Sequence, residues 1–266
     1  MRTPAATLEQ VGSVTIRGIE SIGAGARFIG NVVAAVRETK LVTRESIVQA
    51  RRLGVDSLPI AAFIASFTGI VLALLASYSF TGAVPLYFVG TLVEKTITLE
   101  LAPVLTGLAL AGRVGANIAA EVGTMRVTEQ IDALETLGYD PLSFLVAPRV
   151  IAGIVMFPVV VAAAMIVGCG AAWVASISLL HLSSADFTKG VRLFFETFDV
   201  RYGLVKSSSF GFAVTMIGSM RGLAAEGGAT GVGRAATSAV VYSAVAILSL
   251  DALWAVTWLL GHGSAP

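Results

Sequence analysis

The sequence has few of the residues from which chemical sites are usually built. Of its 266 residues, one is cysteine, two are histidine and 13% are charged. The single Cys169 excludes an internal disulfide and a cluster of thiolate metal ligands, so we predict that it is a small packing residue. His181 and His262 have no Cys, His or acidic neighbours at the spacing of metal ligands, and no metal site is predicted.

Two further absences narrow the functional class. The formal net charge is +1, with no acidic or basic tail, so we expect no nucleic-acid partner. The phosphate-binding pattern G-x-x-x-x-G-K-[ST] does not occur, so no bound cofactor is predicted and the chain lacks this means of holding ATP. Residues 231–236 fit G-x-G-x-x-A, but they follow an apolar run rather than a strand, which favours a glycine-rich turn.

Apolar residues dominate instead. They make up 56% of the chain, and the mean hydropathy is +0.84, more than one soluble core can use. A helix needs about 20 apolar residues to cross a ~30 Å hydrocarbon core. Stretches of this kind occupy residues 58–78, 86–112, 150–178, 203–221 and 237–260. We therefore predict an all-α integral membrane protein with five transmembrane helices.

The first 57 residues have a different pattern. Between Val11 and Val36 apolar residues recur mostly every three or four positions, with arginines and polar residues elsewhere around the helix. This pattern predicts an amphipathic helix that lies in the membrane interface, although a helix of a small soluble domain would look similar. Residues 43–56 form a polar elbow. We divide the chain into an interfacial part, 1–57, and a five-span membrane domain, 58–266.

Basic residues predict the orientation. Residues 1–57 carry eight Lys or Arg, whereas the connection 79–85 carries no charge, so the N-terminus is predicted to be cytoplasmic. Five crossings then place segment 113–149 inside and both the loop 179–202 and the C-terminus outside. The loop 179–202 mixes phenylalanines with charged residues, which predicts an amphipathic helix on the outer leaflet.

Segment 113–149 is charged although it lies between two apolar runs. Its polar side chains recur at helical spacing, and a glycine follows them as a stop signal. These residues are Glu121, Arg126, Glu129, Gln130, Asp132, Glu135 and Gly138. The pattern predicts a short acidic helix in the cytosol. Spacing alone leaves open whether this helix binds a partner or only joins two spans.

Among the ionisable residues inside predicted spans, the candidates for a function are Glu100, Lys206 and Asp251. A charge at the centre of a membrane helix costs at least ~2.5 kcal/mol, so such residues usually face a cavity or a partner. Two interpretations of these residues remain. They form a functional polar site, or they are a structural pair in which Lys206 neutralises Asp251. Glu94 and Lys95 indicate either a local polar rim or a contact between subunits.

Several motifs carry a resemblance to a known family. The chain contains ELAPV at 100–104, AGRVGANIAAE at 111–121 and GTMRVTEQIDALETLGYDPLSFLVAPR at 123–149. Thinner matches are LVKSSSF at 204–210, GATGVGRAATSAVV at 228–241 and LDALW at 250–254. Together they resemble the MlaE/YrbE family, the permease subunits of ABC transporters that work with MCE proteins. High Ala, Gly, Val and Arg content is typical of a GC-rich bacterial genome, and the resemblance implies an actinobacterial YrbE-type member.

The resemblance implies a function and partners. The chain would be a permease in the bacterial inner membrane that moves lipids or other hydrophobic molecules, with residues 121–138 as the coupling helix. ATP and Mg would be bound by a separate ABC ATPase dimer. The other partners would be a second permease subunit, either a paralogue or a second copy, and an extracytoplasmic hexamer of MCE proteins. Glu100, Lys206 and Asp251 would then lie in or beside the lipid pathway, with Leu74 and Tyr78 of the first span on its wall.

Two other classes remain open at this point. A proton gradient acting through Glu100 and Asp251 would make the chain a secondary transporter. Alternatively, the chain could be a scaffold that only anchors MCE proteins. In both cases the polar segment 113–149 would have no ATPase to couple to.

Overall fold

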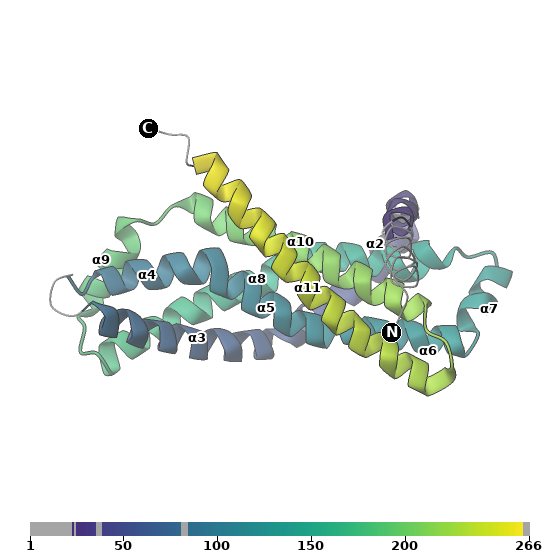
Figure 1. Cartoon of the computed structure of the whole chain (residues 1–266), viewed down its shortest axis with the longest axis horizontal. Helices are drawn as coiled ribbons and strands as arrows, with labels where there is room; N and C mark the ends of the chain where they lie inside the picture. The colour runs from purple at the N-terminus through teal and green to yellow at the C-terminus, as the bar shows by residue number, and fades with distance from the viewer. Residues whose placement is uncertain (1–22, 24, 36–38, 81–84, 263–266) are drawn as a thin grey trace, which may run out of the picture.

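The computed structural model describes residues 23, 25–35, 39–80 and 85–262, and in these residues it contains helices and no strand. An all-α architecture is thereby confirmed for the described chain. The principal helices, drawn in Figure 1, are α2 (Thr39–Leu53), α3 (Leu58–Ser79), α4 (Phe88–Thr96), α5 (Ala102–Leu110), α6 (Ala116–Val127), α7 (Gln130–Thr136), α8 (Ala147–Ser178), α9 (Ser184–Leu193), α10 (Thr197–Leu223) and α11 (Gly228–His262).

Three of these helices join into one continuous rod. Single π-helical turns at Ile97–Leu101 and Ala111–Gly115 link α4, α5 and α6, so that helix runs unbroken over Phe88–Val127, 40 residues. A third π turn, Leu142–Val146, leads directly into α8. At ~1.5 Å per residue the rod is about 60 Å long, twice the thickness of a hydrocarbon core. One end of the rod must therefore extend well beyond a membrane.

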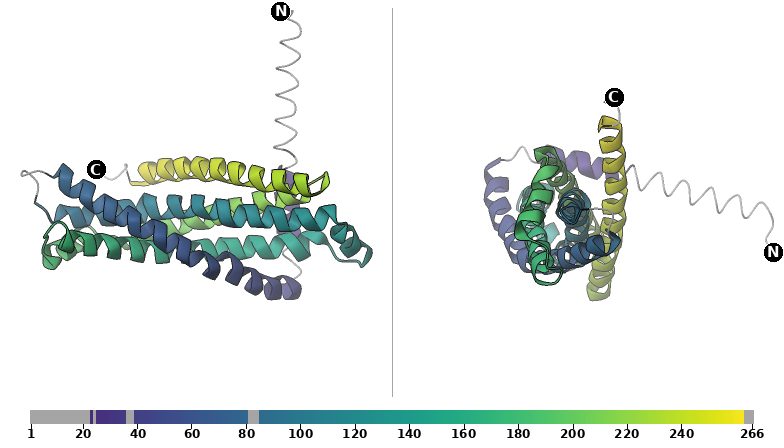
Figure 2. Two further views of the ribbon diagram at one scale, coloured as in Figure 1. Left: turned by 90° about the horizontal axis from the view of Figure 1, so that it is seen from below. Right: turned by 90° about the vertical axis from the view of Figure 1, so that its left-hand side faces the viewer.

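The helices form an elongated bundle with different ends. Figure 1 shows α9 at one end of the long axis and α7 at the other; we call these the α9 end and the α7 end. The helix α10 packs against α8, α11, α6 and α5, while α3 packs mainly on α8. Consequently α3 and α11 lie on different sides of the bundle (Figure 2).

Four helices are long and apolar enough to span a membrane, and the described residues provide no fifth by that measure. They are Thr43–Ser79, Phe88–Val127, Leu142–Ser178 and Gly228–Thr257. Together with the apolar exposed residues described next, they make the chain a multi-pass membrane protein. The predicted span 203–221 falls within α10, which is 27 residues long but carries Lys206 and Arg221. Five spans are thus not confirmed, because α10 is surrounded by other helices and needs less apolar surface.

Large apolar side chains lie exposed on the periphery. On α3, Phe63 is 64% exposed and Leu75 is 57% exposed, and on α11 Val245 and Leu253 are similarly open. Such apolar surface would be unfavourable in water, whereas it suits contact with lipid tails or with another membrane helix. The burial pattern therefore agrees with membrane insertion.

Close contact between α8 and α10 depends on two glycines. A Cβ atom added at Gly211 would lie 2.3 Å from the carbonyl oxygen of Gly153. Since that oxygen belongs to a helix backbone, we expect Gly211→Ala to push the helices apart and destabilise the protein by roughly 1–3 kcal/mol. Gly170→Ala on α8 is the matched control, because a Cβ there meets nothing within 4 Å. Thermal unfolding in detergent should separate the two variants; equal melting temperatures would contradict this account of the packing.

The predictions for the two flanking segments have different outcomes. Most of the predicted N-terminal interfacial helix lies outside the described residues; of it, residues 25–35 are helical, and Val32 is buried beside Val146 and Met216. In loop 179–202 the structure has the helix α9, which buries Phe187, and α10 begins at Thr197, earlier than predicted. No observation tests the division into 1–57 and 58–266, which stays a prediction.

Candidate functional site

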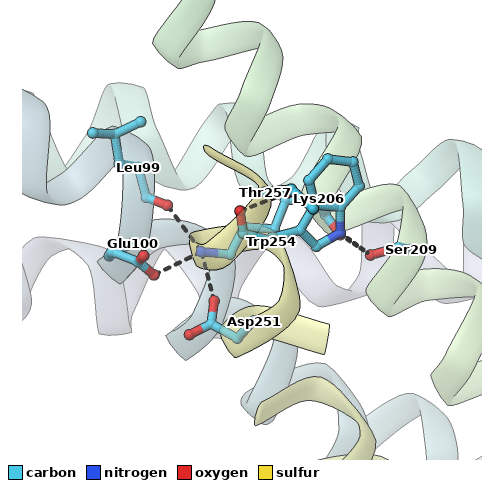
Figure 3. A network of polar contacts seen from close by, with 7 residues as sticks. All are labelled: Leu99, Glu100, Lys206, Ser209, Asp251, Trp254 and Thr257. Carbon is cyan, nitrogen blue, oxygen red and sulfur yellow. Dashed lines mark hydrogen bonds and ion pairs between the residues drawn. The ribbon is translucent and has the colours of Figure 1, made fainter. Parts of the chain in front are cut away.

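Lys206 lies at the centre of a polar cluster inside the bundle. Its Nζ donates hydrogen bonds to Glu100 Oε2 at 2.7 Å and to the carbonyl oxygen of Leu99 at 3.2 Å, and it forms an ion pair with Asp251 Oδ1 at 2.5 Å (Figure 3). The three charged residues come from the π turn after α4, from α10 and from α11. The structure thus brings together all three predicted intramembrane charges; we call Glu100, Lys206 and Asp251 the charge triad.

The backbone acceptor in this cluster follows from the sequence. Pro103 has no N–H, so it cannot donate the helical i→i−4 hydrogen bond to Leu99. The helix widens into a π turn at Ile97–Leu101, directly before α5. The Leu99 carbonyl is thereby available for Lys206. The side chain of Leu99 does not take part in this contact.

The triad carries one positive and two negative charges. The Lys206 side chain is fully buried, whereas Glu100 is 43% exposed and Asp251 is 22% exposed. Glu100 lies roughly 12 residues after Phe88, about 18 Å along the helix, close to the middle of a ~30 Å hydrocarbon core. An exposed carboxylate at this depth requires a polar cavity or a protein partner, because lipid tails cannot solvate it.

Two aromatic residues lie beside the charge triad. Lys206 Nζ lies 5.5 Å from the centroid of the Tyr202 ring, which is within the range of a cation–π contact. Trp254 packs edge-on against Tyr202 and donates its indole N–H to Ser209 Oγ at 3.0 Å. The hydroxyl of Ser209 in turn donates to the Lys206 carbonyl. The helices α10 and α11 are therefore also joined by contacts that do not involve charge.

A second charged cluster lies toward the α9 end. Lys95 forms an ion pair with the buried Asp199 and a looser one, 4.0 Å, with Glu196. Glu94 is only 3% exposed and accepts a long hydrogen bond of 3.5 Å from Thr98. The local polar rim predicted for Glu94 and Lys95 is present, and it ties α4 to the start of α10. A contact between subunits is not tested.

The charged segment at the α7 end is divided into two helices. The spans continue as α6 to Val127, and the chain breaks at Glu129, whose φ of 61° is left-handed. Across this corner Arg126 donates to Asp132 at 2.7 Å. Gln130 and Glu135 lie on α7, and Gly138 follows it with a φ of 82°. The break therefore lies at 128–129, whereas the sequence analysis expected one coupling helix over 121–138.

Glu121 has intrachain partners that the sequence did not indicate. It accepts an ion pair from the buried Arg149 at 3.1 Å and a weaker one from Arg52 at 3.5 Å. The second guanidinium nitrogen of Arg149 donates to the Leu145 carbonyl. These contacts connect α2, α6 and α8 next to residues 128–138, which we call the α7 segment. Glu121 thus belongs to the base of the segment, while Glu129, Gln130 and Glu135 lie beyond it.

Leu74 and Tyr78 lie on a different helix from the residues of the charge triad. Both side chains lie exposed on α3, at 38% and 81%, while the triad joins the α4–α6 rod to α10 and α11. In the described part of the chain, no hydrogen bond or ring contact joins either residue to the triad. They remain predicted wall residues, and one cavity could include them and Glu100 only if another chain completed it.

Tyr202, Arg149 and Asp199 were not predicted as site residues, because they lie just outside the predicted spans. The partners of Arg149 and Asp199 are 28 and 104 positions away in the sequence, whereas Tyr202 is four positions from Lys206. Within the described residues, no group of three His, Cys, Asp or Glu side chains has the geometry of a metal site.

Comparison with known proteins supports the family resemblance of the sequence over most of the chain. Residues 46–257 match the family described as Permease MlaE. A protein of Rickettsia conorii that carries the name of an ABC transporter permease is 41% identical over 238 residues, 90% of this chain and 92% of its own. A Synechocystis protein of similar name is 38% identical over 235 residues, 88% and 89% of the two chains. The chloroplastic Arabidopsis thaliana protein TRIGALACTOSYLDIACYLGLYCEROL 1 is 31% identical over 236 residues, 89% of this chain and 67% of its own.

Proposed function

This chain belongs to the MlaE permease family of ABC transporter proteins, and from that premise we propose that it moves lipids or other hydrophobic molecules through the membrane together with MCE proteins. The observation that carries the proposal is Glu100, a partly exposed carboxylate of the buried charge triad near the middle of a span. A polar lining at that depth suits an amphiphile with a headgroup. The name of the plant relative, which contains that of a lipid, supports this choice.

ATP hydrolysis is assigned to a separate subunit. Permeases of ABC transporters work with an ATPase, and this sequence has no G-x-x-x-x-G-K-[ST] pattern. The chain itself is proposed to be neither an enzyme nor the holder of ATP or Mg. Its contact with an ATPase dimer is the α7 segment, which projects from the bundle and is joined to two long helices (Figure 1). A rigid connection of this kind transmits domain movements.

The proposed topology has five spans, with α10 as the fourth. The α7 end faces the cytoplasm of a bacterial inner membrane, because the basic N-terminal region precedes the first span on that side. Three crossings precede α9, which places the α9 end outside, and the C-terminus follows five crossings and lies outside only if α10 crosses. Its 27 residues extend about 40 Å at ~1.5 Å per residue, enough for one crossing.

A second permease chain, a copy or a paralogue, is proposed to cover the triad face. Glu100 is open in a single chain, and lipid is a poor solvent for it. Two facing chains would enclose the carboxylates in a shared cavity whose wall includes Leu74 and Tyr78. The α9 end, where Phe194 and Phe195 are exposed, is the side proposed for the MCE hexamer.

Reconstitution tests the proposal against both alternatives. The chain, its partner ATPase and its MCE protein would be placed in liposomes with a fluorescent phospholipid. We expect lipid transfer to the MCE protein to require ATP hydrolysis and to stop with a non-hydrolysable analogue. Transfer driven by a proton gradient without ATP would indicate a secondary transporter, and complex formation without any transfer would indicate a scaffold.

A further inference from the structure

A cleft lies between α2 and the inner part of the α4–α6 rod, toward the α7 end and away from the charge triad. Its volume is about 320 Å³, the space of roughly ten water molecules at ~30 Å³ each. The cleft walls include Gln49 and Arg52 of α2, Arg113 of the second π turn, and Asn117 and Glu121 of α6. Five polar side chains thus converge on a space that no other part of the described chain fills.

Two of these side chains have no partner within the described part of the chain. Arg113 is only partly exposed, yet its guanidinium forms no hydrogen bond or ion pair there. Gln49 is 8% exposed and its amide also has no hydrogen bond. Gln49 is buried and Arg113 is partly buried, so a partner that supplies their missing hydrogen bonds would be favourable. Both side chains have donors, so the missing group is an acceptor.

The charge in the cleft favours an anion. The single carboxylate is Glu121, and it is already paired with Arg149 and Arg52. Arg113 therefore adds a positive charge that the local residues do not neutralise. A guanidinium fork binds phosphate with two parallel hydrogen bonds, and an amide N–H can add a third.

The cleft lies at the depth of lipid headgroups if the proposed function and its membrane placement hold. Arg113 is roughly 25 residues after Phe88, about 37 Å along a rod that crosses a ~30 Å hydrocarbon core. On the other wall, Gln49 and Arg52 precede α3, whose 22 residues match one crossing. Both walls thus reach just past the inner edge of the hydrocarbon.

We propose that Arg113, Gln49 and Asn117 form a binding site for the phosphate group of a phospholipid in the cytoplasmic leaflet. This site lies apart from the charge triad and is separate from the ATPase contact on α7. It would hold a lipid by its headgroup at the base of the coupling segment, where Glu121 joins three helices. Free phosphate has the same chemistry and is distinguished by the test below.

The test is a binding measurement on the purified full chain in detergent. Native mass spectrometry would follow titration with dioctanoyl phosphatidylglycerol, with dioctanoylglycerol, which lacks the phosphate, and with inorganic phosphate. We expect Arg113→Gln to weaken binding of the phosphatidylglycerol at least about ten-fold, and Gln49→Leu to weaken it by a smaller factor. Arg51→Gln is the matched control, since it removes the same charge from α2 outside the cleft.

Each outcome has a clear consequence. Stronger binding of phosphatidylglycerol than of the other two probes, lost in Arg113→Gln, supports a lipid site; displacement by inorganic phosphate at equal concentration supports the phosphate site with free phosphate as its ligand. Unchanged binding in both cleft variants overturns the proposal, as does weakened ATPase affinity in Arg113→Gln with lipid binding intact. A higher melting temperature of the wild-type chain with phosphatidylglycerol, but not with dioctanoylglycerol, gives a readout that needs no variant. No step requires ATP-driven transport, so failure of the proposed function would be seen separately.

Discussion

Replacing Lys206 with methionine is expected to destabilise the chain by about 3–5 kcal/mol. The substitution leaves an unbranched side chain that is one atom shorter and removes the charge that compensates Glu100 and Asp251, and a buried charge without its partner is strongly unfavourable. The expected result is a large loss of folded protein. Fluorescence-detected gel filtration and thermal unfolding in detergent would measure it, with Lys189→Met on the exposed helix α9 as the control.

A triple variant separates stability from transport. Adding Glu100→Gln and Asp251→Asn to Lys206→Met removes all three charges, and we expect it to restore most of the stability, since a neutral cluster needs no compensation. If the triad only holds α10 and α11 in place, the triple variant should transport lipid normally. If Glu100 lines the lipid path, transport should stay low, as it should in Glu100→Gln alone while the complex remains assembled.

The sequence identified the three residues of the charge triad, but it did not predict how they are arranged. Glu100, Lys206 and Asp251 stood out because charges are rare in apolar spans, and pairing of Lys206 with Asp251 was one of two readings. That Glu100 shares the same ammonium could not be read from spacing, because 106 positions separate it from Lys206. Pro103 is visible in the sequence, but only the π turn of the structure shows that the Leu99 carbonyl is left free for another donor.

Helix boundaries were predicted less well where polarity changes within one helix. The apolar run 86–112 ends in sequence, but the helix continues to Val127, since α6 is supported by α10 and α11 rather than by lipid. The helix α10 is likewise underestimated by hydropathy, because it is as long as a span although its composition is mixed. Hydropathy reports contact with lipid, so it underestimates helices that other helices surround.

Replacing Glu129 and Gln130 together with alanine is expected to weaken binding of the partner ATPase at least about ten-fold and to abolish ATP-driven lipid transfer. Both residues are exposed at the corner between α6 and α7, and neither side chain contributes to the ion pairs of Glu121. Charged groups on such a surface set affinity and partner choice through complementary contacts. Surface plasmon resonance with the chain in nanodiscs would give the affinity.

The control for this variant is Glu196→Ala, which removes an exposed carboxylate at the α9 end and should leave ATPase binding unchanged. A second variant, Asp132→Ala, tests the geometry of the corner. It breaks the 2.7 Å contact with Arg126 but leaves Glu129 and Gln130 in place, so ATPase binding should persist while ATP hydrolysis and lipid transfer become uncoupled. Survival of both ATPase binding and transfer in the Glu129 and Gln130 variant would show that the α7 segment only joins two helices.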